Sequence, residues 1–368
     1  MRGPVRRLTF GEGDAHDAEL MLGREWLVTN GLGGFASGTL SGVPTRRYHG
    51  LLVAALPTPL GRTLMFNHLS EWLRLPAGER RQIGGQELAG GRLEWPGAKH
   101  LREFRLEGGL PVWRYGLGGH VVEKRVLMVH GQNTVHVTYK LVEGEGPLRL
   151  KLRPALQFRP LEGAVHSSAD EPYTVTSTED RLEVSTGHKY PPLRLKIYGP
   201  RATFALDGGK LQGVHYRAEE RRGYDHTGEL WTPGYFSVDV AGDVTATLVG
   251  STESWDLIRA LSPEEARDAE HERRERLLAS AAPSAREGVA AELVLAADQF
   301  VITPSGRQED AARAHAAGEE VRSVIAGYHW FTDWGRDTMI SLEGLTLTTG
   351  RWREAGFIVR TFAQYVQN

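Results

Sequence analysis

The chain has 368 residues, of which 40% are hydrophobic and 24% charged, and its formal net charge is −2. This length is enough for two ordinary domains, and the near-neutral charge argues against nucleic acid as a partner. The absence of cysteine excludes disulfides, thiolate metal ligands and a cysteine nucleophile. No leader-like apolar segment follows the basic N-terminus, and no apolar run is long enough to span a membrane. The composition predicts a soluble, cytoplasmic protein with no membrane partner.

From about residue 20 to residue 250, apolar and polar residues alternate. The segment "TVHVTYKL" (134–141) places Val135 and every second residue after it on one face, and His136 on the other. Strict alternation is typical of antiparallel strands with one buried and one wet face. Turn signals such as Asp207-Gly208-Gly209 and Ala241-Gly242-Asp243 separate the runs. The pattern predicts a large antiparallel β-sandwich.

The pattern changes near Leu261. Ser262 followed by Pro263 and Glu265 has the spacing of a capping box at the start of a helix. The many charges that follow predict a solvated connecting helix.

A second, more apolar helix is predicted after residue 286. Its apolar stripe is expected to contain Val289, Leu293, Ala296 and Phe300, at spacings of three and four. The polar residues 303–323 are expected to form a loop or excursion.

Two further helical patterns end the chain. One continues from Arg336 through Leu347 to a stop at Thr349-Gly350. The other carries an apolar stripe of Ala355, Ile358, Phe362 and Tyr365. Three or four helices are too few to bury their own apolar faces, so we expect the chain to be cut inside a second domain.

A glycine-rich stretch, "TNGLGGFASGTLSGVPTRRYHGLLV", lies near the N-terminus. Residues 31–36 formally match a dinucleotide fingerprint, but poor helix formers follow where that motif needs a helix. Two interpretations remain open: sharp turns between strands, or a loop that touches a sugar site in the neighbouring domain. The candidate contacts of such a loop are Asn30, Arg46, Arg47, Tyr48 and His49.

Several other enzyme classes lack their signatures. The histidines show no zinc-protease spacing, so no metal site is predicted, and neither a Gly-x-Ser-x-Gly elbow nor a Walker loop occurs. The sequence therefore gives no support to a zinc protease, a serine hydrolase with this elbow, or a Walker-type nucleotide-binding protein.

The segment "GYHWFTDWGRDTMISLEGL" contains the most informative cluster: Trp330, Asp333, Trp334, Arg336 and Asp337. Aromatic rings pack against the apolar faces of a sugar, while carboxylates and guanidinium groups bind its hydroxyls. The alternative is local: Asp333 as an N-cap, Asp337 as a first-turn charge paired with Arg336, and both tryptophans in the core. Residue types alone leave these two interpretations open.

The segment "WFTDWGRDTMISLEGLTLTTGRWREAGFIVRTFAQYVQN" resembles the start of the glucosidase domain of glycogen debranching enzymes, the amylo-α-1,6-glucosidase family. The glycine-rich stretch resembles the signature of the N-terminal domain that precedes it. The resemblance implies a β-supersandwich at 1–255, a linker helix at 256–282, and the first helices of a truncated (α/α)₆ barrel at 283–368.

The resemblance also implies inverting hydrolysis of α-1,6-linked glucose at branch points of glycogen, limit dextrin or another branched α-glucan, without a cofactor. Arg336 and Asp337 then match residues that hold the terminal glucose, with Trp330, Asp333 and Trp334 lining the same pocket. The catalytic acid and base are expected beyond Asn368. The alternatives are another glucoamylase-like or phosphorylase-like enzyme of α-glucans, or a non-catalytic glycan-binding module.

Overall fold

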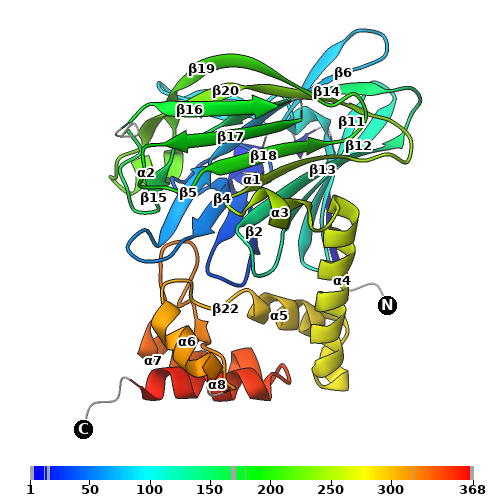
Figure 1. Ribbon diagram of the computed structural model, residues 1–368. Helices are drawn as coiled ribbons and strands as arrows, with labels where there is room; N and C mark the ends of the chain where they lie inside the picture. The colour runs from blue at the N-terminus through cyan, green and yellow to red at the C-terminus, as the bar shows by residue number, and fades with distance from the viewer. Residues whose placement is uncertain are drawn as a thin grey trace.

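The computed structural model places a β domain before a group of helices (Figure 1). It describes residues 4–11, 13–14, 17–166, 171–178, 180–316 and 318–364. The last strand of the β domain ends at Ser251, and from Trp255 onward the described chain is mainly helical. The predicted order, an antiparallel β domain followed by helices, is therefore confirmed.

Three antiparallel sheets build the β domain within the described residues. The nine-stranded sheet consists, in spatial order, of β1 (Val5–Thr9), β10 (Leu101–Glu107), β11 (Leu110–Leu117), β12 (His120–Met128), β13 (Thr134–Glu143), β21 (Ala246–Ser251), β18 (Leu193–Tyr198), β17 (Arg181–Thr186) and β16 (Tyr173–Thr178). The seven-stranded sheet consists of β7 (Arg80–Ile83), β6 (His68–Arg74), β14 (Leu148–Ala155), β20 (Thr227–Val240), β19 (Thr203–His215), β8 (Gln86–Leu88) and β9 (Arg92–Glu94). The five-stranded sheet consists of β15 (Arg159–Pro160), β5 (Arg62–Phe66), β4 (Gly50–Ala55), β3 (Phe35–Thr39) and β2 (Glu25–Thr29).

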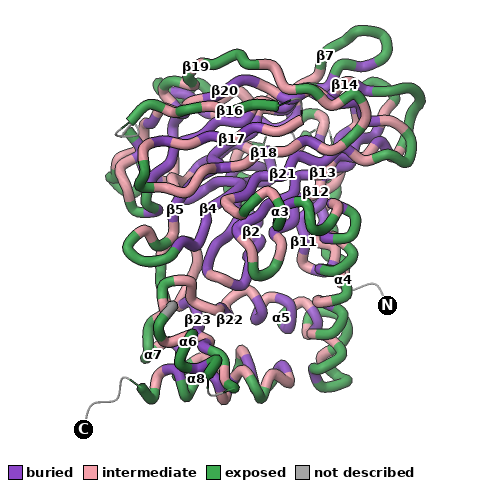
Figure 2. The backbone as a smooth tube through the Cα atoms, in the orientation of Figure 1, coloured by how far each residue is buried: buried purple, intermediate pink, exposed green. Residues whose placement is uncertain are grey.

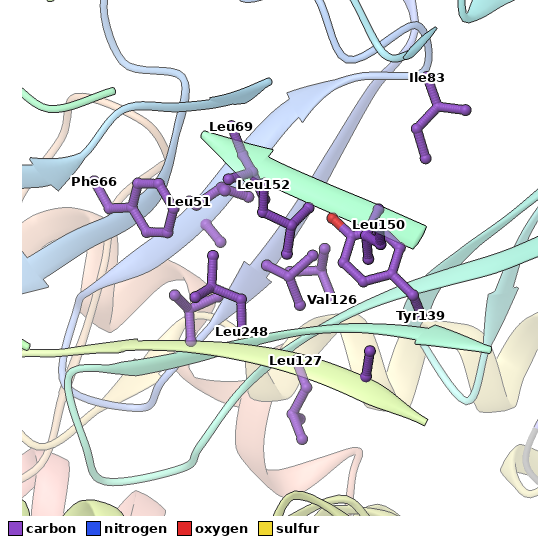
Figure 3. Packing of buried hydrophobic residues seen from close by; sticks show 14 of the residues in the cluster. Leu51, Phe66, Leu69, Ile83, Val126, Leu127, Tyr139, Leu150, Leu152 and Leu248 are labelled. Carbon is purple, nitrogen blue, oxygen red and sulfur yellow. The ribbon is translucent and has the colours of Figure 1, made fainter. Parts of the chain in front are cut away.

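One apolar core joins the inner faces of these sheets. Val135 and Tyr139 of β13 are fully buried, and so is Leu150 of β14 in the opposite sheet. Figure 3 shows Tyr139, Val126 and Leu150 from different strands meeting in this core. The predicted period-two pattern is correct for this face, because every second side chain of a strand points to the same side.

The opposite face of β13 departs from the expectation of a wet surface. His136 on that face is only 5% exposed, because helix α4 (Pro263–Ser280) lies against this part of the sheet (Figure 1). Two hydrogen bonds tie the helix there: Thr245 Oγ1 donates to Glu264 at 2.6 Å, and Arg274 Nη1 donates to the Gly108 carbonyl at 2.9 Å.

Helix α4 begins as the sequence predicts but is less solvated than expected. Ser262 Oγ accepts from the Glu265 amide at 3.2 Å, and the Glu265 carboxylate accepts from the Ser262 amide at 2.8 Å, which completes the capping box. Glu270 and Arg274 are nevertheless buried and form an ion pair at 2.6 Å. Part of the charge on α4 is therefore structural, which corrects the expectation of a purely solvated helix.

The apolar stripe predicted for the next helix is wrong. In α5 (Gly288–Asp298), Val289 and Leu293 are 61% and 64% exposed, whereas Val294 and Leu295 are buried. Phe300 lies beyond the end of the helix. The helix has apolar residues on both sides, so the spacing of its apolar residues did not determine which side packs against the rest of the protein.

The polar stretch 303–323, expected as a loop or excursion, contains helix α6 (Gln308–Ala316). Short strands flank it, β22 (Val301–Ile302) and β23 (Ser323–Val324), which pair with each other. Asp207-Gly208-Gly209 is also not a turn between strands, because it lies inside β19 at a register irregularity. The signal at 241–243 does separate β20 from β21.

The last helices follow their predicted pattern. Helix α7 (Gly335–Leu342) continues through a π-helical turn (Glu343–Leu347), and Gly350 then adopts a positive φ of 80° before α8 (Trp352–Ala363). Ala355 and Ile358 are buried as predicted, and Tyr365 lies outside the described residues. The shorter helices are α1 (Ala18–Gly23), α2 (Arg217–Arg221), α3 (Trp255–Arg259) and the 3₁₀ turns Ala98–His100 and Pro283–Ala285.

The helical part is less buried than the β domain, as Figure 2 shows. Large apolar side chains stand exposed on three of its helices: Leu293 on α5, Ile340 on α7 and Trp352 on α8 are 64%, 77% and 68% exposed. No helix within the described ranges is long and apolar enough to cross a membrane.

Candidate functional site

The tryptophan–aspartate–arginine motif lies on the loop between β23 and α7 and in the first turn of α7, and this loop docks on the five-stranded sheet of the β domain. The Tyr328 and Phe35 rings lie 5.5 Å apart, centroid to centroid, and the Trp330 and Tyr48 rings lie 5.7 Å apart. All four side chains belong to one apolar cluster. The two sequence motifs, far apart in the chain, therefore meet in space.

Arg62, the first residue of β5, holds the backbone of this loop. Its guanidinium donates hydrogen bonds to the carbonyl oxygens of His329, Trp330 and Phe331 at 2.6, 3.0 and 2.6 Å. A planar guanidinium presents several donors in a fixed fork, so it can fix three successive peptide groups at once. The orientation of Trp330 thus depends on a side chain from the β domain.

His329 is buried beneath the loop. Its Nε2 lies 2.8 Å from Ser37 Oγ, and because Ser37 itself donates to the Trp26 carbonyl at 2.7 Å, His329 is the donor to Ser37. Burial, assisted by the nearby positive charge of Arg46, lowers the pKa of His329 to about 3. The imidazole is therefore neutral at physiological pH and serves as a fixed hydrogen-bond donor.

Trp330 lies between guanidinium groups of the β domain. The Arg46 and Arg222 groups lie 5.9 and 5.2 Å from its ring centroid, within the range of cation–π contacts. Arg46 is held by Glu25 at 2.6 Å, and His49 Nε2 lies 3.2 Å from the same carboxylate. Burial alone would raise the pKa of Glu25, but His49 and Arg46 outweigh it and hold the pKa at about 2. Glu25 is therefore an anion that fixes both partners.

In one of the two interpretations, the glycine-rich stretch supplies contacts to a sugar site. Of these candidates, Arg46, Tyr48 and His49 lie close to the loop that carries Trp330, whereas Asn30 has a structural role. The Asn30 amide donates to the Gln132 carbonyl and to Asn133 Oδ1, both at 3.0 Å, and its oxygen accepts two backbone N–H groups of the following turn. Gly31 and Gly33 adopt positive φ values of 73° and 96° in this turn. The turn connects β2 with β3, which agrees with the first interpretation, sharp turns between strands.

Asp333 is half-buried and supports the loop. Its Oδ2 accepts from Arg307 Nη2 at 2.7 Å and from Ser323 Oγ at 2.8 Å. It is not the N-cap of α7: that position belongs to Trp334, which makes no side-chain capping bond. The structure therefore gives Asp333 a role in shaping the loop.

Trp334, Arg336 and Asp337 form an open group at the start of α7. Trp334 is 47% exposed and its ring lies 5.3 Å from that of Phe331, which continues the aromatic surface from Trp330. The Arg336 side chain is 77% exposed, and its Nε lies 3.7 Å from Asp337 Oδ2, which is too far for a hydrogen bond. Within the described part of the chain, Asp337 Oδ2 is a buried oxygen without a hydrogen-bond partner.

Two site residues had no individual signal in the sequence, Arg62 and Arg222, because only the fold brings them to the loop. His329 was missed although it lies inside the motif, between Tyr328 and Trp330. No group of three or more histidine, aspartate or glutamate side chains within the described residues is arranged to hold a metal ion.

Family models match both parts of the chain. Residues 24–247 match the model described as glycogen debranching enzyme N terminal, and residues 295–368 match the model described as amylo-alpha-1,6-glucosidase. A solved structure of a bacterial glucoamylase complexed with acarbose is similar over 81% of this chain, with 7% identity and a TM-score of 0.36. This chain spans 42% of the length of that protein. No curated protein matches the chain.

The first of these models alone covers more than half of the 368 residues, and the second begins inside α5. The two matches follow the same order as the β domain and the helical part. The chain therefore belongs to the glycogen debranching enzyme family.

Proposed function

We propose that the protein is a glycoside hydrolase that releases α-1,6-linked glucose from a branched α-glucan such as glycogen or limit dextrin. In this proposal, the loop 327–334 and the start of α7 form one wall of the pocket for the terminal glucose. The observation that carries it is Asp337 Oδ2, a buried acceptor without a partner in the described residues, beside the exposed Arg336 and Trp334. A sugar hydroxyl can supply the hydrogen-bond donor that this oxygen lacks.

Each group then has a role in binding. Trp330 and Trp334 offer ring faces for the apolar faces of glucose, Arg336 offers donors, and Asp337 offers an acceptor. Arg46 and Tyr48 of the β domain set the position of Trp330. The residues of the wall therefore orient the sugar and exclude water from one of its faces.

The proposed chemistry is inversion, in which one carboxylic acid protonates the leaving oxygen while a second carboxylate activates water on the opposite face. Arg307 and Ser323 already engage the carboxylate of Asp333 through Oδ2, whereas Asp337 has a buried oxygen without a hydrogen-bond partner in the described residues. One such carboxylate does not make an acid–base pair. We therefore assign Asp337 to substrate positioning and place neither catalytic role on a residue of the wall.

We also propose that α5, α7 and α8 are the first helices of an (α/α)₆ barrel whose further helices cover their outward faces. Exposed large apolar side chains on all three helices, Leu293, Ile340 and Trp352, support this proposal, since large exposed apolar patches mark sites of interaction. Size-exclusion chromatography with light scattering should show self-association of this chain, relieved by Ile340→Asp. A dispersed monomer of the unsubstituted chain, with no bound apolar dye, would contradict the barrel proposal.

The function is tested with this chain and a phosphorylase-limit dextrin. Titration calorimetry should detect dextrin binding that is weakened at least about tenfold, or 1.4 kcal/mol, by Asp337→Asn and by Trp334→Ala. Asp256→Asn, at an exposed position on α3, is the matched control and should bind normally. Binding that is insensitive to both site variants would refute the proposed wall.

Glucose release measured in the same samples tests the assignment of roles. We expect this 368-residue chain by itself to bind dextrin without releasing glucose at a steady rate, because no acid–base pair is assigned within it. Steady release abolished by Asp337→Asn would mean that an acid and a base both lie within these residues, so our placement of the chemistry would be wrong.

A further inference from the structure

A cavity lies away from the candidate site, between helix α4 and the outer face of the nine-stranded sheet. Its volume is about 570 Å³, which is in the usual range for small-ligand sites. It shares no lining residue with the wall around Trp330. We call it the α4 cleft.

On the sheet side of the α4 cleft, strand register places several polar side chains next to one another. Arg114 pairs with Glu123 across β11 and β12, and Glu123 pairs with Lys140 across β12 and β13. The next row pairs Thr138 with Thr247 across β13 and β21, with their hydroxyl oxygens 2.9 Å apart. Directly opposed residues in a sheet have neighbouring side chains, so these groups form a polar patch on the floor, beside apolar lining residues such as Val112 and Val126.

The helix side of the cleft is polar as well. Glu264, Arg267, His271 and Arg274 line it and recur every three or four residues, which places them on one face of α4. A helix normally turns its apolar stripe toward a sheet. Here α4 turns these polar side chains toward the sheet, a cavity remains between them, and the hydrogen bonds of α4 to Thr245 and Gly108 hold the helix in place.

His136 is the most informative group in the α4 cleft. It is 5% exposed, and its Nδ1 is buried with no hydrogen-bond partner among the residues that the structure describes. Burial lowers the pKa of His136 to about 4, so the ring is neutral near pH 7 and has one donor and one acceptor nitrogen. Buried polar atoms normally have partners, so this nitrogen requires a polar group from outside the described chain.

The charge and ring content of the lining narrow the class of ligand. Among its described residues, the lining has six lysine or arginine side chains and four glutamates, and no phenylalanine, tyrosine or tryptophan. Two of the cations stand at the rim: Arg114 contacts Glu123 through Nε at 3.1 Å, and Lys140 lies 3.4 Å from the exposed Asp243. The other four cations of the lining are paired with carboxylates. Arg114 uses only its Nε in its contact and Lys140 pairs only with an exposed carboxylate, so these two keep donors for an anion.

We propose that the α4 cleft binds a small hydroxyl-bearing anion of the sugar-phosphate class. The cations at the rim bind the phosphate, while His136 and the threonine hydroxyls bind hydroxyl groups deeper in the cleft. Because the cleft and the wall around Trp330 share no lining residue, this site is independent of the proposed glucan pocket. An effector bound here would lie against α4, the helix that connects the β domain to the helical part.

The test uses glucose 6-phosphate as the probe, titrated calorimetrically into the 368-residue chain. Glucose and inorganic phosphate are titrated separately, and we expect each to bind at least about tenfold more weakly than the combined probe. The double variant Arg114→Gln, Lys140→Gln should weaken binding of the probe about tenfold or more. Thr138→Val, which removes one hydroxyl with little change in shape, should weaken it by a smaller factor.

Lys210→Gln is the matched control, because Lys210 is an exposed, ion-paired lysine of the seven-stranded sheet. It should leave the affinity unchanged. The proposal is overturned if a folded chain does not bind the probe, if inorganic phosphate binds equally well, or if the double variant binds normally. Loss of probe binding in Asp337→Asn would also overturn it, since the ligand would then occupy the glucan pocket.

Discussion

Replacing Arg62 by methionine should release the loop that carries Trp330 from the β domain. Methionine keeps an unbranched apolar stem but removes the guanidinium that donates to the carbonyls of His329, Trp330 and Phe331. No carboxylate pairs with Arg62 among the salt bridges of the described residues, so the substitution mainly removes these three bonds.

The expected cost follows from the number and environment of the bonds. A hydrogen bond to a charged group contributes about 1.5–3 kcal/mol. Three such bonds share one guanidinium here, and water can partly replace them because Phe331 in this loop is 39% exposed. We therefore expect about 2–4 kcal/mol, which corresponds to a loop-opening equilibrium raised about 30- to 900-fold.

Hydrogen exchange of peptides covering 326–334, followed by mass spectrometry, measures this opening directly. Arg62→Lys should fall between wild type and Arg62→Met, because an ammonium group cannot span three carbonyls. Arg153→Met, at a surface ion pair with Asp207, controls for the loss of an arginine. Exchange in the loop that rises less than about threefold in a folded Arg62→Met protein would refute the clamp.

Three further substitutions test other parts of the structure. Burial alone would raise the pKa of Asp298, but Arg273 and Arg351 outweigh it and hold the pKa at about 2, against its usual 3.8. The lowered pKa stabilises the folded protein by about 2 kcal/mol above pH 4, and this stabilisation is lost as the pH falls toward 2. The free energies of unfolding of wild type and Asp298→Asn should therefore differ above pH 4 and converge near pH 2 in acid denaturation. Ser262→Ala should cost about 1 kcal/mol and speed hydrogen exchange in the first turn of α4; unchanged exchange would mean that the capping box contributes nothing. Gly350→Ala should lower the melting temperature, because φ is 80° and the new Cβ would lie 2.1 Å from a backbone oxygen; an unchanged value would show that the turn relaxes freely.

Local patterns in the sequence predicted much of the fold. Alternation predicted the antiparallel strands, the Ser262 capping box predicted the start of α4, and Gly350 predicted the stop before α8. These signals succeed because each depends on residues within one or two turns of chain. Trp330 and its neighbours were likewise conspicuous by residue type, although those types were compatible with either a sugar-binding cluster or a local structural role.

What the sequence by itself determined, therefore, is the type and order of the elements and the chemistry of the motif. Only the tertiary structure decided which face of α5 is buried, that Asn30 supports a turn, and that Arg62 holds a loop 267 residues away. The physical reason is the range of the interactions. Periodicity records which faces can be buried, but the partner that buries them, or that satisfies a distant carbonyl, exists only once the chain has folded.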